Sequence, residues 1–193
     1  MRKLFIISIL FSALAGGAYA QESGGFGIGI HVLGGGRYDN VRMCVGSPPA
    51  VPGGPIGEIY LDLRFSAGEN GKLIVNLPVM RPILFAAAFQ MLQFEPQVTY
   101  EYTFGTGDGL RPVVAGGLGA VFHYGPDYNS NPENPGPSFF SVGPLITGSA
   151  GFKFWKERII TGLKLFYAPL FTAGRPLGTI AGGGVEAQLI LGE

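Results

Sequence analysis

The residues best suited to acid–base chemistry in this chain are its two histidines, His31 and His123. A serine hydrolase needs a histidine beside a serine and an acid. His123 is the better candidate, because Asp127 follows it closely and it lies at the rim of a predicted strand. Its serine would be Ser138 or Ser141. No spacing signature supports this site, and a structural histidine is the simpler interpretation, so we predict no catalytic residues and no enzyme activity.

Metal and cofactor sites also find little support. The segment 127–133 alternates acidic and amide residues like a weak calcium loop, but it lacks the Gly and the terminal Glu of an EF-hand. The Gly-x-Gly run at 105–109 is not a phosphate loop, because no strand–glycine–helix context follows it. Cys44 is the single cysteine and has no metal-ligand spacing around it. We therefore expect no metal and no cofactor.

A set of balanced charges is the second chemically active group. Four acidic and four basic residues lie on the polar faces of predicted strands: Asp62, Arg64, Glu95, Glu101, Arg111, Lys153, Lys164 and Glu186. Desolvated charges need such a balance, whereas charges on a soluble surface do not. We predict that they form a network in a closed lumen, with Glu101 near Arg111 and Lys164 near Glu186. The network would either neutralise the interior or line an ion path.

The strands that carry these charges are identified by the alternation of apolar and polar residues, which has a period of two. From Leu92 to Thr103, apolar and polar residues alternate strictly, which indicates a strand with one apolar and one polar face. Soluble strands usually end after about five or six residues, whereas a tilted membrane strand needs roughly 9–11. The turn Gly105–Gly109 follows, and a second long segment runs to Tyr124. We interpret this hairpin as the repeating unit of a transmembrane β-barrel.

The same pattern recurs along the chain. It predicts eight strands, near residues 26–32, 59–66, 72–79, 92–103, 110–124, 140–154, 159–167 and 185–191. Short turns are expected at 68–71, 105–109 and 155–158, and longer connections at 35–56, 80–91, 125–137 and, less clearly, 172–178. Bacterial outer-membrane barrels show this asymmetry, with short periplasmic turns and longer external loops. The fold class is therefore all-β, an eight-stranded antiparallel up-and-down transmembrane barrel.

The N-terminus and the composition agree with an envelope location. Met1-Arg2-Lys3, the apolar run Leu4–Leu14 and the small-x-small site Ala18–Ala20 predict a secretory signal peptide at 1–20, leaving a barrel domain at 21–193. After Leu14 no apolar run approaches the roughly 20 residues of a membrane helix. Charged residues are only 13% of the chain, against about 25% usually. Acidic and basic residues number 13 each, which argues against a nucleic-acid partner.

Aromatic residues gather near both predicted ends of the strands. Those near the short-turn end are Phe26, Phe65, Tyr102, Phe104, Phe152, Phe154 and Trp155, and those near the other end are Phe122, Tyr124, Phe139, Tyr167 and Phe171. Two such belts are what a membrane with two interfaces selects. A soluble eight-stranded barrel such as a lipocalin would instead turn its apolar set inward. Because such a barrel shows a similar alternation, a secreted barrel that binds an apolar ligand stays open as an alternative.

This architecture resembles the small bacterial outer-membrane β-barrel proteins, the OmpA/OmpX/OmpW-like group. The resemblance covers the signal peptide and the hairpin pattern and contains no motif match. One departure is the last strand, which ends Leu191-Gly192-Glu193 without the C-terminal aromatic residue usual in such proteins. The resemblance implies an integral protein of the bacterial outer membrane, in contact with lipid. Its lipid A-modifying members imply a second alternative, an embedded enzyme that would use His123.

The expected role is structural or adhesive, or passage of a small solute. Any extracellular ligand or protein would be recognised by the loops 35–56 and 125–137.

Overall fold

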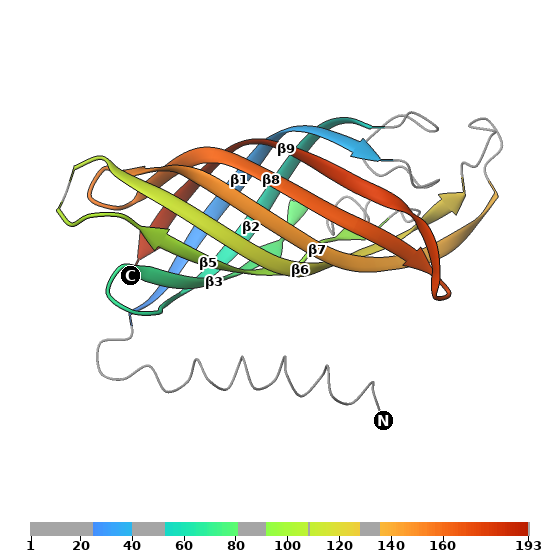
Figure 1. Ribbon diagram of the computed structural model, residues 1–193, viewed down its shortest axis with the longest axis horizontal. Coiled ribbons are helices and arrows are strands. Elements are labelled where there is room, and N and C mark those ends of the chain that lie inside the picture. The colour runs from blue at the N-terminus through green and yellow to red at the C-terminus, as the bar shows by residue number, and fades with distance from the viewer. Residues whose placement is uncertain (1–24, 40–52, 81–91, 108, 128–135, 193) are drawn as a thin grey trace, which may run out of the picture.

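The chain folds into an antiparallel β-sheet that closes on itself (Figure 1). The computed structural model describes residues 25–39, 53–80, 92–107, 109–127 and 136–192. Within them, no helix is long and apolar enough to cross a membrane. The strands are β1 (Phe26–Asp39), β2 (Gly54–Ser66), β3 (Gly71–Pro78), β4 (Leu92–Phe94), β5 (Gln97–Thr103), β6 (Arg111–Asp127), β7 (Gly136–Phe154), β8 (Ile159–Thr172) and β9 (Arg175–Gly192).

Apart from the short β4, which is skipped by the pairing of β3 with β5, each strand pairs with its neighbours in the chain, and β1 pairs with β9 to close the ring. β4 and β5 both pair with β6 and lie in line, so the ring has eight members, as the sequence predicts. The predicted single strand Leu92–Thr103 is interrupted at Glu95 and Pro96, where proline has no N–H to donate. The register continues across the break, because Phe94 faces Phe122 and Gln97 faces Gly119.

Several strands are longer than predicted. β1 continues to Asp39 and β2 begins at Gly54, so both ends of the predicted loop 35–56 are strand. The reason is that Gly34, Gly35 and Gly36 carry no side chains to show an alternation, yet their backbones pair with both β2 and β9. The predicted loop 125–137 shortens in the same way, between Asp127 and Gly136. Residues 40–52, 128–135 and nearly all of the predicted loop 80–91 lie outside the described residues.

The connection between β8 and β9 corrects another expectation. The sequence predicts a longer connection over 172–178, but β8 and β9 are joined by the two residues Ala173 and Gly174. Their φ values of 47° and 77° are those of a tight hairpin turn. The three turns predicted to be short do lie between β2 and β3, β5 and β6, and β7 and β8. We call the end of the barrel that carries these three turns the short-turn end; the turn Ala173–Gly174 lies at the other end. Ile28 faces Gly192, so both ends of the described barrel lie at the short-turn end.

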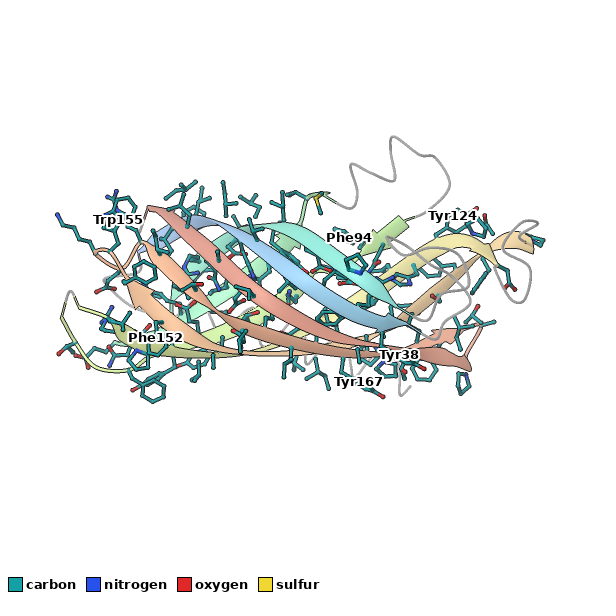
Figure 2. The ribbon with its side chains drawn as sticks, turned by 90° about the horizontal axis from the view of Figure 1, so that it is seen from above. Tyr38, Phe94, Tyr124, Phe152, Trp155 and Tyr167 are labelled. Atoms are coloured by element: carbon teal, nitrogen blue, oxygen red, sulfur yellow. The ribbon has the colours of Figure 1, made fainter. Side chains whose placement is uncertain are left out.

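The apolar side chains point out of the barrel and the charged ones point in. Leu163 is 64% exposed and Leu118 69%, whereas Glu101 is 1% exposed and Lys164 5%. This is the reverse of a soluble barrel, in which the apolar set fills the centre. Figure 2 shows Phe152 and Trp155 toward the short-turn end, and Tyr38, Tyr124 and Tyr167 toward the other. Phe139 departs from the predicted belts, because it packs against the interior.

Part of the interior is apolar, which the alternation did not indicate. A cluster of buried residues lies toward the end opposite the short turns, and we call it the apolar cluster: Leu33, Ile56, Val121, Leu145, Phe166, Ala168, Leu170 and Ile180. Phe139 and Leu177 pack against it. β8 contributes three of these residues, because its apolar pairs at 165–166 and 170–171 place one side chain on each face. The lumen is therefore polar on only part of its length.

Candidate functional site

All eight side chains of the predicted charge set lie inside the barrel, each no more than 9% exposed. They come from β2, β5, β6, β7, β8, β9 and the short link before β5, since alternate residues of these strands face the centre. The interior also holds Arg37, Glu58, His31 and His123, none of which the sequence analysis placed in that set. Arg37 and Glu58 add one charge of each sign, so the buried charges stay balanced.

The first group of contacts lies near the short turns, and we call it the turn-end network. Arg64 Nη2 lies 2.7 Å from Glu101 Oε1, and Lys153 Nζ lies 3.4 Å from the same oxygen. Arg64 Nη1 also donates to Gln188 Oε1 at 3.1 Å. The four side chains come from β2, β5, β7 and β9, so the network crosses the barrel. Glu101 is therefore shared between two buried cations.

Arg111 takes a partner that the hairpin register did not predict. Its Nη2 lies 2.6 Å from Glu157 Oε2, in the turn between β7 and β8, and its Nη1 donates to the carbonyl of Gly105 at 3.3 Å. Arg111 thus ties two neighbouring turns together at the barrel rim, while Glu101 lies deeper against Arg64 and Lys153. The expected pairing of Glu101 with Arg111 is replaced by these two separate sets of contacts.

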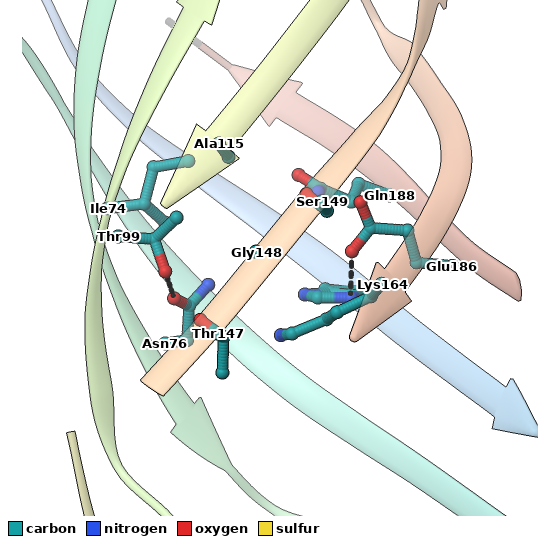
Figure 3. A pocket seen from close by; sticks show the side chains of 11 residues that line it. Ile74, Asn76, Thr99, Ala115, Thr147, Gly148, Ser149, Lys164, Glu186 and Gln188 are labelled. Atoms are coloured by element: carbon teal, nitrogen blue, oxygen red, sulfur yellow. Dashed lines mark hydrogen bonds and ion pairs between the residues drawn. The ribbon is translucent and has the colours of Figure 1, made fainter. Parts of the chain in front are cut away.

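A second group surrounds a small cavity at mid-height (Figure 3). His31 Nε2 lies 3.1 Å from Glu186 Oε2, and His31 Nδ1 lies 3.9 Å from Asp62 Oδ2. Lys164 and Glu186 line the same cavity, as the sequence predicts for this pair. The cavity measures about 10 Å³, which is room for no more than about one water molecule.

Hydrogen bonds fix the remaining polar groups at this height. Asn76 donates to Asp62 at 2.6 Å and accepts from Thr99 at 2.7 Å, while Thr147 donates to Gln97 at 2.9 Å. The centroid of the Tyr60 ring is 5.1 Å from that of His31 and 5.0 Å from Lys164 Nζ. These contacts hold the side chains across the lumen in place of an open path.

A third group contains His123, and its position corrects the prediction. His123 lies not at a rim but inside the barrel, fully buried and directly opposite Ser141 on β7. His123 Nε2 is 3.9 Å from Glu95 Oε1, which is longer than a hydrogen bond. Gln93 donates to Glu95 and accepts from Arg37, the latter at 2.6 Å. A serine, a histidine and an acid do meet here, but Ser141 and His123 are both 0% exposed, which leaves no surface for a substrate.

Only some of the interior residues that the sequence analysis missed could have been found from a pattern in the sequence. Glu58 and Arg37 belong to the inward sets of β2 and β1 and lie one and five residues beyond the predicted strand limits, so longer strands would have included them. The inward residues Phe166, Ala168 and Leu170 had no such signal, since the outward face of β8 is apolar as well.

The arrangement has a simple chemical consequence. Side chains of opposite sign meet across the interior near the short turns, and the apolar cluster lies toward the other end, so both parts of the described interior hold buried side chains. In the described part of the chain, no three His, Cys, Asp or Glu side chains are placed to hold a metal ion.

Comparison with known proteins gives only distant likeness. No protein-family model and no curated protein sequence matches the chain. The N-terminal β-barrel domain of OprF from Pseudomonas aeruginosa is similar in structure, with 14% identity and a TM-score of 0.44 over 84% of this chain and 97% of that one. Neisserial surface protein A (NspA) has 9% identity and a TM-score of 0.46 over 87% of this chain and 99% of that one. Both are small outer-membrane β-barrels, the group that the hairpin pattern resembles.

Proposed function

We propose that this protein is an integral β-barrel of the bacterial outer membrane whose lumen is closed by its own side chains. It would act as a structural or adhesive scaffold, not as an open pore or an enzyme. The observation that carries the proposal is the distribution of side chains, with large apolar residues exposed around the barrel and charged residues buried inside it. The TM-scores above are below 0.5, so the proposal rests on this distribution and not on the likeness to other structures.

The exposed apolar surface supports contact with lipid. A soluble monomer rarely shows an apolar patch above a few hundred Å². Here apolar side chains are exposed on every long strand, among them Ile30 on β1, Leu118 on β6, Ile146 on β7 and Leu165 on β8. In water such a surface would drive aggregation, whereas hydrocarbon accepts it. The ring also closes through β1 and β9, as membrane-spanning sheets require, although β4 pairs with β6 alone among the described residues.

The filled lumen supports a scaffold role. Eight strands leave an interior just wide enough for side chains to fill. The cavity found at mid-height is water-sized, and the apolar cluster lies between it and the end opposite the short turns. We propose that recognition falls to the segments joining the strands at that end, 40–53 and 128–135, which correspond to the predicted loops 35–56 and 125–137.

Fractionation tests the membrane location. Cell envelopes that contain the protein would be washed with carbonate and urea, then extracted with detergent. We expect the protein to stay with the outer membrane through both washes and to leave it only with detergent, because the exposed apolar surface needs an amphiphile. Release by the aqueous washes alone would contradict the proposal and favour a secreted barrel.

Conductance tests the closed lumen separately. The purified protein would be reconstituted into planar lipid bilayers, with insertion checked by protease protection in vesicles made from the same lipid. We expect no discrete current steps from inserted protein, because in the proposed state buried side chains close the lumen. Reproducible steps would contradict the scaffold role and indicate solute passage, without affecting the membrane location.

A further inference from the structure

The turn between β7 and β8, Trp155–Arg158, carries more exposed positive charge than its own contacts neutralise. Lys156 and Arg158 are exposed. The one acid of the turn, Glu157, lies 2.6 Å from Arg111 and so has a partner of its own. The turn therefore presents two cations to its surroundings, beside an indole that is 61% exposed.

The backbone of this turn is held in an uncommon shape. Trp155, Lys156 and Glu157 have φ values of 53°, 53° and 65°, a left-handed conformation that costs a non-glycine residue roughly 1–2 kcal/mol. The other three tight turns of the described barrel place glycine at such positions, at Gly68, Gly105 and Gly174, the last beside Ala173 with a φ of 47°. A connection that only joined two strands would gain from glycine here as well.

Contacts on both sides of the turn maintain that shape. Within it, the N–H of Arg158 donates to the carbonyl of Trp155 at 3.2 Å, and the Arg158 carbonyl accepts from the N–H of Ile190 on β9 at 2.8 Å. Arg111 joins Glu157 to the carbonyl of Gly105 in the adjacent turn. Lys156 and Arg158 are thus displayed from a braced turn, with little ordering left to be done when a ligand binds.

The position of the turn identifies the surroundings. Trp155 lies at the short-turn end of the barrel together with the exposed ring of Phe152 (Figure 2). Indole rings concentrate where hydrocarbon meets headgroups, and lysine and arginine side chains reach outward from there to the lipid phosphates. If the barrel spans the outer membrane as proposed, the short turns face the periplasmic leaflet.

We infer that the turn Trp155–Arg158 is a binding site for an anionic phospholipid headgroup, with Lys156 and Arg158 contacting the phosphate and Trp155 lying at the glycerol level. Charge complementarity selects an anionic lipid over a zwitterionic one, because the turn has two cations left after Glu157 is paired. The inference rests on the proposed membrane location and adds a lipid class and a site to it.

The chain offers its own reporter, because Trp155 is its single tryptophan. The full-length protein would be placed in bilayers of phosphatidylglycerol and phosphatidylcholine in equal parts. In one set the phosphatidylglycerol is brominated near the top of its chains, and in the other the phosphatidylcholine is. Quenching of Trp155 then reports which lipid lies beside it. We expect a preference for the anionic lipid of at least about fivefold, which is the value for a single cation, because two cations face the headgroup.

Variants assign the preference to the turn. The double variant Lys156→Gln/Arg158→Gln should quench equally in both sets, while Lys72→Gln, which removes a cation at the start of β3 on another turn, should keep the wild-type preference. Equal quenching of the wild type, or a preference that survives the double variant, would overturn the site. Loss of the preference in Lys72→Gln as well would also overturn it, since the effect would then come from net charge.

A second reporter separates this inference from the membrane location. In a Trp155→Phe background, Leu118→Trp places the only indole at the middle of the outward face of β6. Quenching of that indole by mid-chain brominated lipids of either headgroup would show that the barrel is embedded, so that equal quenching at Trp155 would count against the headgroup site alone. No quenching of that indole would contradict the proposed location itself.

Discussion

The interior of the barrel is filled in two different ways toward its two ends. Near the short turns, Arg64, Lys153 and Glu101 form a cross-barrel ionic contact, with Gln188 as a further partner of Arg64. Toward the other end, the apolar cluster fills the space by packing. An ionic contact in a buried space is held by geometry, because each charge needs its partner. Apolar side chains, by contrast, pack stably as long as they fill the available volume, even when their exact positions vary.

A narrow barrel can therefore be closed by its own side chains without a single continuous apolar core. The ionic contacts fix which strands face one another across the lumen, since Arg64 on β2 reaches Glu101 on β5 past the intervening β3. The apolar cluster gains stability from dry contact in a region where the outward face is apolar too. If this is correct, the two ends should respond differently to the same kinds of substitution.

The largest expected effect is at the turn-end network. Glu101→Gln keeps the size of the side chain but leaves Arg64 and Lys153 buried without their carboxylate. We expect a loss of about 3–5 kcal/mol in the free energy of unfolding, the cost of breaking a buried ion pair. Urea titration in lipid vesicles, followed by Trp155 emission, measures it. The matched control is Glu69→Gln, whose side chain is exposed in the turn between β2 and β3 and whose removal should cost at most about 1 kcal/mol. Similar losses for both variants would contradict the burial of the network.

A smaller effect is expected in the apolar cluster. Leu170→Ala removes methyl groups from a site that is 1% exposed, so it should cost about 2–4 kcal/mol through lost contact and a residual cavity. The same urea titration applies. Leu110→Ala, at a position that is 66% exposed beside a short turn, should change the free energy of unfolding by less than about 1 kcal/mol. A loss at Leu170 no greater than that at Leu110 would show that the cluster is not packed.

The smallest effect concerns the backbone contact between β1 and β9. A Cβ added at Gly35 would lie 2.2 Å from the carbonyl oxygen of Gly183, whereas one added at Gly34 would meet nothing within 4 Å. Gly35→Ala should therefore cost about 1–3 kcal/mol, because one strand must move. Gly34→Ala should be nearly neutral or slightly stabilising. Equal unfolding midpoints for the two variants would indicate that β1 and β9 are not this close.

Strand number and side-chain direction could be predicted from the sequence because both follow from a period of two. Strands such as Leu92–Thr103 alternate cleanly, and the turn glycines mark their ends. The extents of β1 and β2 could not be predicted, because Gly34–Gly36 shows no alternation and Pro55 resembles a loop residue. The two-residue turn at Ala173–Gly174 could not be predicted for a similar reason, because Pro176 and Gly178 are residue types typical of a longer loop.

The contacts of the interior were less predictable than the faces. Hairpin register places Lys164 and Glu186 together, because β8 and β9 are neighbours. It cannot place Arg64 beside Glu101, since their strands are separated by β3 and meet only through the curvature of the closed barrel. Likewise it could not place His123 inside, because the polar residues after it resemble a loop while β6 in fact continues to Asp127.

The central claim is that the apolar exterior contacts lipid chains while the interior does not. Magnetisation transfer from lipid acyl-chain protons to leucine methyl groups, measured by NMR with the protein in lipid nanodiscs, tests it most directly. We predict strong transfer to Leu118, Leu163 and Leu165, and little or none to Leu33, Leu145 and Leu170. Transfer to the second set at the level of the first, or its absence from both, would contradict the account.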